Sequence, residues 1–161
     1  MKAIFLDIDG VLNNVKHCVE ICDKLLGKEQ YWALYRAISQ MPFDYRCCEL
    51  LQQLIEKTGA IVVLSSTWRA NKKNIDIVEK FAGIKIYDRT PILNTIRGEE
   101  IEHYLKQHQE ISHYVIIDDD SDMLKTQKSH FCLVNREIGF SKKNYKKCLE
   151  ILNNGKQMDV V

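Results

Sequence analysis

Residues 3–13 read AIFLDIDGVLN, a short apolar run that ends in two aspartates and a glycine. The first four residues have the length and apolar character of a buried strand in a parallel sheet. Asp7 and Asp9 lie two positions apart, and side chains two apart in an extended segment share a face. Gly10 then permits a tight turn. The stretch therefore predicts a first strand that presents two carboxylates at its carboxyl end.

The rest of the chain alternates between strand-like and helix-like segments. Short β-branched runs predict strands at 60–64 and 114–117, with weaker candidates at 84–87 and 131–134. Apolar residues spaced three and four apart indicate helices within 18–26, 31–41, 47–55, 101–105 and 145–152. The alternation predicts an α/β fold, a three-layer α/β/α sandwich with a mainly parallel, Rossmann-like sheet.

A single domain covering residues 1–161 is expected, because no repeat, low-complexity tract or Pro/Gly-rich linker divides the chain. Two helical patterns lie between the first strand and the helix at 47–55, although a direct crossover needs only one. The surplus predicts a small, cap-like helical insertion at about residues 14–45. It would stand near the carboxyl ends of the strands, where doubly wound folds bind their ligands.

Composition excludes several classes of partner. The formal net charge is +1, so no global field attracts nucleic acid or an anionic membrane. No apolar run approaches the ~20 residues of a membrane span, and the N-terminal run is too short for a signal peptide. We expect a cytoplasmic protein without a membrane partner. The six cysteines include no Cys-x-x-Cys pair, so we expect buried thiols rather than a zinc site.

Reactive residue types also follow the second and third clear strands. The second strand runs into Ser-Ser-Thr-Trp-Arg at 65–69, where hydroxyls and free backbone N–H groups can hold phosphate. The third runs into Asp-Asp-Asp-Ser-Asp at 118–122, a cluster that needs a cation or a proton. Each motif alone is compatible with a helix cap or a solvated turn. All three in this order, each closing a strand, favour an active site that holds a hard divalent metal.

The segment 7–13 resembles motif I of the haloacid-dehalogenase-like (HAD) hydrolases, Asp-x-Asp-Gly-Thr/Val-Leu. Ser65 resembles motif II, and the acidic residues at 118, 119 and 122 resemble motif IV. Within the superfamily, LSSTWR at 64–69 and RGEEI at 97–101 are similar to the phosphatase domain of bacterial and phage multi-enzyme "Swiss army knife" RNA-repair proteins.

This resemblance implies a magnesium-dependent phosphomonoesterase. Asp7 would be the nucleophile that forms an aspartyl phosphate, and Asp9 would act as general acid and then base. Mg²⁺ would be held by Asp7, by the backbone carbonyl of Asp9, and by either Asp118 or Asp119.

The phosphoryl group would contact Ser65, with Ser66 as a register-shifted alternative. The family's motif III is usually Lys. Here the best-placed cation is Arg97, with Lys72, Lys73 and Arg89 as lesser candidates.

Substrates are expected to be phosphorylated small molecules, nucleotides or nucleic-acid ends. The intervals between the motifs leave no room for a cap domain, so we expect an open site, which suits the end of a polymer or a phosphoprotein better than a small sugar phosphate. Trp68 could stack on a base and Arg69 could contact a second phosphate. Alternatively, Trp68 is a core residue and Arg69 only orients the acidic cluster. The alternatives to a nucleic-acid phosphatase are a receiver-like phosphoaspartate signalling module, a binding protein with a decayed site, and a nucleotidase for free mononucleotides.

Overall fold

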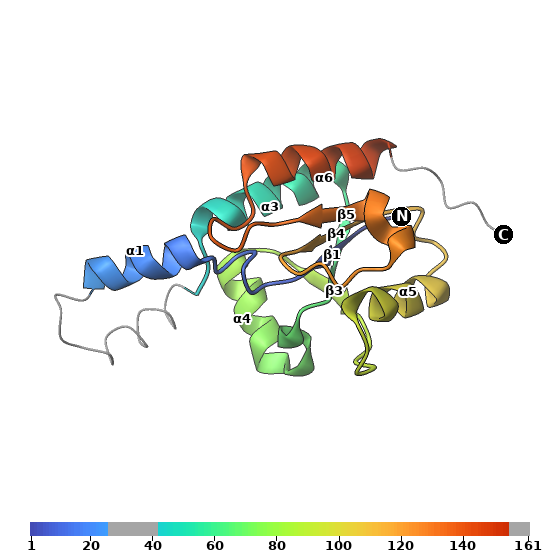
Figure 1. Ribbon diagram of the computed structural model, residues 1–161, viewed down its shortest axis with the longest axis horizontal. Helices are drawn as coiled ribbons and strands as arrows, with labels where there is room; N and C mark the ends of the chain where they lie inside the picture. The colour runs from blue at the N-terminus through green and yellow to red at the C-terminus, as the bar shows by residue number, and fades with distance from the viewer. Residues whose placement is uncertain (26–41, 155–161) are drawn as a thin grey trace.

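A five-stranded parallel sheet forms the centre of the computed structural model, which describes residues 1–25 and 42–154 (Figure 1). The strands lie in the order β3-β2-β1-β4-β5. Their bounds are β1 Lys2–Leu6, β2 Ile61–Leu64, β3 Ile86–Arg89, β4 His113–Asp118 and β5 Phe131–Leu133. The predicted α/β class and parallel sheet are therefore confirmed.

Helices cover both faces of this sheet because its strands are apolar on both faces. Along β1, Ile4 and Leu6 pack into one buried cluster with α3 (Tyr45–Thr58), α4 (Lys72–Ala82) and α6 (Lys142–Asn154). Ala3 and Phe5 pack on the other face against α5 (Arg97–Gln107). Figure 1 shows α3 and α6 side by side, with α5 across the sheet from them. This is the predicted three-layer arrangement.

Several boundaries differ from the sequence prediction. β3 begins two residues later than expected, and its pairing with β2 shifts register between Val62 and Val63. The helix α4 was not predicted from the sequence; it is capped at its start by the Asn71 side chain and at its end by Gly83. Two short 3-10 helices, η1 (Thr67–Ala70) and η2 (Lys125–His130), were not expected either.

The helix α1 (Val15–Leu25) follows the motif at the end of β1 and corresponds to the first part of the predicted insertion. The second predicted helix, at 31–41, lies outside the described residues. The single-domain assignment and the extent of the insertion therefore stay predictions.

The strand order brings the two acidic motifs together. β1 pairs in parallel with β2 on one side and β4 on the other, so the chain reverses its direction of winding between β1 and β4. The ladder reaches past the strand ends, where the Asp7 N–H donates to the Ile117 carbonyl at 3.0 Å. Doubly wound sheets form their ligand crevice at such a point.

Most of the cysteines are buried, as expected. All six thiols are free; four are buried, while Cys18 and Cys22 are half-buried. Among the helices of the described ranges, none has both the length and the apolar character needed to span a membrane.

Candidate active site

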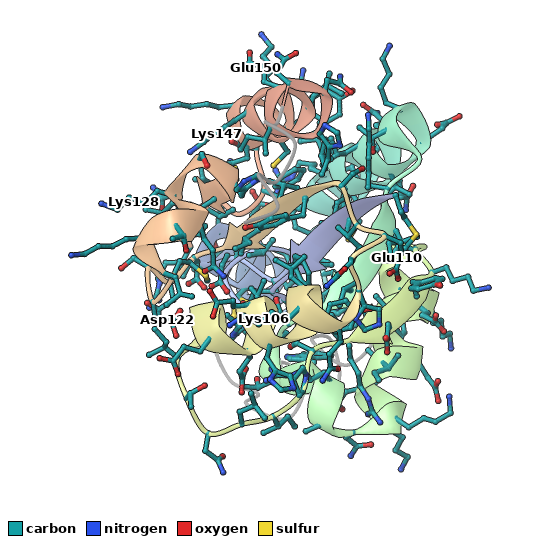
Figure 2. All side chains as sticks on the ribbon, turned by 90° about the vertical axis from the view of Figure 1, so that its right-hand side faces the viewer. Lys106, Glu110, Asp122, Lys128, Lys147 and Glu150 are labelled. Atoms are coloured by element: carbon teal, nitrogen blue, oxygen red, sulfur yellow. The ribbon has the colours of Figure 1, made fainter. Side chains whose placement is uncertain are left out.

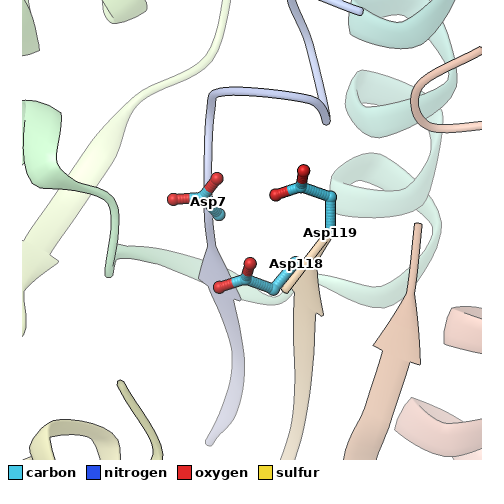
Figure 3. A group of neighbouring side chains, drawn as sticks. All are labelled: Asp7, Asp118 and Asp119. Carbon is cyan, nitrogen blue, oxygen red and sulfur yellow. The ribbon is translucent and has the colours of Figure 1, made fainter. Parts of the chain in front are cut away.

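Three carboxylates converge above the ends of β1 and β4. One oxygen each of Asp7, Asp118 and Asp119 lies within 4.8 Å of the others, and Figure 3 shows the three groups facing a common space. Asp7 is 5% exposed and Asp118 is 1% exposed. Three anionic groups this close repel one another strongly unless a cation or protons intervene.

Gly10 is required by the approach of Asp119. Its φ of +75° lies in the left-handed region, and a Cβ built on it would come within 2.4 Å of Asp119 Oδ2. The turn at Gly10 thus leaves room for the third carboxylate of the cluster. On its outer side, Asp119 forms an ion pair with Arg136 at 3.0 Å.

Arg97 supplies the cation inside the cluster. Its Nη1 donates to Asp7 Oδ1 at 2.9 Å and lies 3.4 Å from Asp118 Oδ2. The lesser candidates lie elsewhere: Lys72 pairs with Asp76 on the surface of α4, Lys73 is exposed on the same helix, and Arg89 donates to the Arg69 carbonyl.

The start of α5 is fixed from the acidic loop, and this places Arg97. Ile96 offers no side-chain cap, so Asp122 Oδ2 accepts the Arg97 N–H at 3.0 Å (Figure 2). Gly98 lets α5 approach η2 closely, because a Cβ there would meet the Leu124 nitrogen at 2.6 Å. The buried Gln127 bonds the Gly98 carbonyl at 2.8 Å.

Burial dominates the electrostatics of the two inner carboxyl groups. It raises the pKa of Asp7 above its usual value, while the Arg97 guanidinium and the Ser66 hydroxyl oppose the rise. Burial, followed by repulsion from Asp7, raises the pKa of Asp118 to about 7.

One buried oxygen of Asp118 accepts no hydrogen bond from the described residues. Asp118 Oδ2 has no hydrogen bond within the described part of the chain, despite the Arg97 nitrogen at 3.4 Å. A buried lone pair without a hydrogen bond and three converging carboxylates are what a hard cation with oxygen ligands would satisfy.

The corner after β2 places two buried hydroxyls near Asp7. The Ser65 and Ser66 backbone N–H groups both donate to the Leu6 carbonyl, at 3.0 and 3.3 Å, which ties this corner to the end of β1. Ser65 Oγ is buried and has no hydrogen-bond partner among the described residues. The Ser66 hydroxyl interacts with the Asp7 carboxyl. Of the two serines, Ser66 is therefore the one whose hydroxyl acts on the Asp7 carboxyl.

Arg69 lies inside the protein rather than at the site mouth. Its Nε donates to the Thr90 carbonyl, and its Nη atoms bond the carbonyls of Ser65, Ser66 and Pro91 and the Glu100 carboxylate. These contacts use all five N–H donors of a guanidinium. Within the described residues none of these donors goes to the acidic cluster, and the predicted contact of Arg69 with a substrate phosphate stays a prediction. Arg69 instead joins the Ser65–Ser66 corner to α5.

Asp9 stands on the exposed rim of the site. Asn13 Nδ2 donates to its Oδ1 at 2.7 Å, and Trp68 Nε1 donates to its Oδ2 at 3.1 Å. Its negative charge acts on Asp7, because it contributes to the raised pKa of that group. The N–H edge of the Trp68 indole is thus turned toward Asp9, and the predicted stacking of a base on its ring stays a prediction.

Five of the predicted site residues line a cavity of about 350 Å³: Asp7, Asp9, Arg97, Asp118 and Asp119. The predicted residues Ser65, Ser66, Trp68 and Arg69 are not among its lining residues. Its other wall residues include Asn13, Thr67 and Arg136, for which no role was predicted. Asn13 is the last residue of the motif at 7–13, so its place in that motif could have indicated that it belongs to the site. Arg136 lies in the loop after β5, and nothing in the sequence around it marks it as part of a site.

A parallel sheet in this order, with Asp-x-Asp after its central strand and an acidic loop after the adjacent strand, defines the HAD-like class. The family model described as "HAD domain in Swiss Army Knife RNA repair proteins" matches residues 3–145, and the chain belongs to this family. No curated protein and no solved structure matches the chain. Membership supports a HAD-type phosphatase in general terms.

Proposed function

We propose that the protein is a magnesium-dependent phosphomonoesterase that works through an aspartyl phosphate on Asp7. The observation that carries the proposal is the position of Asp7. It is buried, it faces Asp118 and Asp119, and it is bound by Arg97 at 2.9 Å. A carboxylate nucleophile for a phosphate ester needs such surroundings, because the anion must approach another anion.

The chain's own residues divide the reaction into two steps. An Asp7 oxygen attacks phosphorus, the ester P–O bond breaks, and the Asp9 carboxyl gives its proton to the departing oxygen. Asp9 then takes a proton from a water molecule, whose oxygen attacks phosphorus and releases Asp7 and inorganic phosphate. Arg97 neutralises charge on the transferring group, and the hydroxyl of Ser66 or Ser65 donates to its oxygens.

Asp7, the backbone carbonyl of Asp9, and Asp118 or Asp119 would hold Mg²⁺. When bound, the ion would screen the carboxylates from the incoming phosphate and polarise a phosphoryl oxygen. The excess of acidic groups and the Asp118 oxygen without a hydrogen bond support this cofactor.

The substrate class we propose is a phosphorylated nucleic-acid end or a nucleotide. The family description names RNA repair proteins, and the rim of the cavity offers a second cation besides Arg97. Arg136 lines the cavity and its side chain is 63% exposed. A cation there suits an internucleotide phosphate beside the one being removed.

The test is a panel of substrates with Mg²⁺: 3′- and 5′-phosphorylated oligonucleotides, mononucleotides, sugar phosphates and p-nitrophenyl phosphate. We expect release of inorganic phosphate, with the highest kcat/KM for the oligonucleotides or nucleotides. Chelation should stop turnover, and Ca²⁺ should replace Mg²⁺ poorly because it prefers looser, higher coordination. Full activity in excess chelator would contradict the metal. A clear preference for sugar phosphates would contradict the substrate class alone, and preference for mononucleotides over oligonucleotides would favour the nucleotidase alternative.

A further inference from the structure

Asp9 is exposed to solvent, yet its carboxylate is held at both oxygens. Asn13 Nδ2 binds one oxygen at 2.7 Å, and Trp68 Nε1 binds the other at 3.1 Å. An exposed aspartate normally samples several rotamers in water. Two donors from two different segments restrict this one to a single orientation.

Each donor is itself fixed. Asn13 belongs to the turn after β1, where its Oδ1 accepts the Gly10 N–H at 3.0 Å and its backbone forms a bridge with Asp9. The Trp68 backbone N–H is capped by Ser66 at 3.5 Å, and its ring packs against the buried Phe43 with centroids 5.5 Å apart. The indole N–H therefore reaches Asp9 from a rigid support.

We infer that Trp68 and Asn13 are positioning residues that hold Asp9 for proton transfer, an inference that rests on the proposed function. The side-chain oxygens of Asp9 are not part of the three-carboxylate cluster. The two hydrogen bonds keep this carboxyl on the rim, where the leaving oxygen departs, and away from the metal-binding oxygens. We call Trp68 and Asn13 together the Asp9 clamp.

The inference makes a chemical distinction between substrates. A phosphorylated sugar, nucleotide or nucleic-acid end leaves as a strongly basic alkoxide, which needs a proton in the transition state. The p-nitrophenolate ion is a weak base and leaves without one. Loss of the Asp9 clamp should therefore slow the alkyl substrates far more than the aryl substrate.

Trp68→Phe removes the indole N–H while keeping an aromatic ring against Phe43. We expect kcat/KM for a mononucleotide and for a sugar phosphate to fall about 10-fold to 100-fold, less than the full loss of acid–base catalysis. For p-nitrophenyl phosphate the fall should be less than about threefold, since no protonation is required there. Asn13→Ala removes the other donor without placing a second negative charge beside Asp9, and it should give the same selective pattern.

Phe43→Leu tests the support of the clamp, because it trims the packing under Trp68 while both hydrogen-bond donors remain. It should give the same selective pattern as Trp68→Phe in a weaker form. Equal losses for alkyl and aryl substrates in Trp68→Phe would show a merely structural role and overturn the inference, as would unchanged kinetics. A loss confined to oligonucleotides would instead show that Trp68 stacks on a base. Failure of the proposed function is distinct, since the wild-type protein would then release no phosphate from any substrate.

Discussion

The floor and the rim of the cavity contain the same kinds of groups in different surroundings. On the floor, Asp7 and Asp118 are nearly inaccessible and share Arg97. On the rim, Asp9 is exposed, and Arg136 pairs with Asp119 while 63% of its side chain is exposed. Burial lets charges on the floor shift one another's pKa, whereas water screens those on the rim. The floor is thus suited to holding a cation and a nucleophile, and the rim to proton transfer and recognition.

The comparison first predicts unequal losses for the two motif aspartates. Asp7→Asn should abolish turnover of every substrate, because an amide cannot form the acyl phosphate. Asp9→Asn should reduce kcat for alkyl phosphates by about 10²–10⁴-fold and retain measurable turnover. Steady-state assays of purified proteins with matching circular dichroism spectra check this. Substantial turnover by Asp7→Asn would show that Asp7 is not the nucleophile.

The buried support of the floor should be the most sensitive site for stability. Glu100→Gln leaves the guanidinium of Arg69, which is 4% exposed, without its counterion. Breaking one partner of a buried pair costs about 3–5 kcal/mol, so the midpoint of urea unfolding should fall sharply. Glu102→Gln, which breaks the exposed pair with Lys106, is the control and should cost under about 1 kcal/mol. Similar effects for both variants would contradict the buried role of Arg69.

The floor should also give the metal-free protein an unusual dependence on pH. The pKa of Asp118 is raised to about 7 by burial and by Asp7, and that of Asp7 is raised too. Between about pH 4 and 7 the folded protein therefore holds protons that the unfolded chain has released. Its unfolding free energy should fall as pH rises through this window, by up to about 1.4 kcal/mol per pH unit for each such group.

Urea unfolding in chelator at pH 5 and pH 7.5 measures this trend. Asp118→Asn should flatten it, and saturating Mg²⁺ should remove it by favouring the ionised carboxylates. Greater stability of the metal-free protein at pH 7.5 than at pH 5 would contradict the assignment.

The smallest effect is expected on the rim. Arg136→Gln should lower kcat/KM for phosphorylated oligonucleotides by about 10-fold, the loss of one phosphate contact, and change p-nitrophenyl phosphate hydrolysis little. Water screens its pair with Asp119 because 63% of the Arg136 side chain is exposed, so the pair is worth at most about 1 kcal/mol and stability should hardly change. If Arg136 served only to orient Asp119, kcat/KM would fall equally for all substrates, and a higher Mg²⁺ concentration would be needed for half-maximal activity.

Local patterns were sufficient to predict the sheet and the floor. β1 and β4 run into aspartates that line the cavity, and β2 runs into the Ser65–Ser66 corner beside the end of β1, because parallel strands place their carboxyl ends at one edge. Arg97 was found because it opens a helix before the third of these strands.

Contacts between distant segments were not predictable in this way. LSSTWR could not reveal that Arg69 points inward to Thr90 and Glu100, or that the Trp68 N–H points to Asp9, since both depend on how β2, β3 and α5 pack. Arg136 is brought to the rim by the loop after β5, which has no local motif. The Asp122 cap of α5 likewise links two segments that are 25 residues apart.

The central claim, a covalent phosphate on Asp7, can be measured directly by trapping it. Asp9→Asn with p-nitrophenyl phosphate and Mg²⁺ should form the intermediate, because this leaving group needs no acid, and hydrolyse it slowly for want of a base. After acid quenching and peptic digestion at low pH, where an acyl phosphate survives longer, mass spectrometry should find one hydroxylamine-labile phosphoryl group on the peptide that contains Asp7. Consumption of substrate with that peptide unmodified, or a phosphoryl group on another residue such as Asp118, would contradict the account.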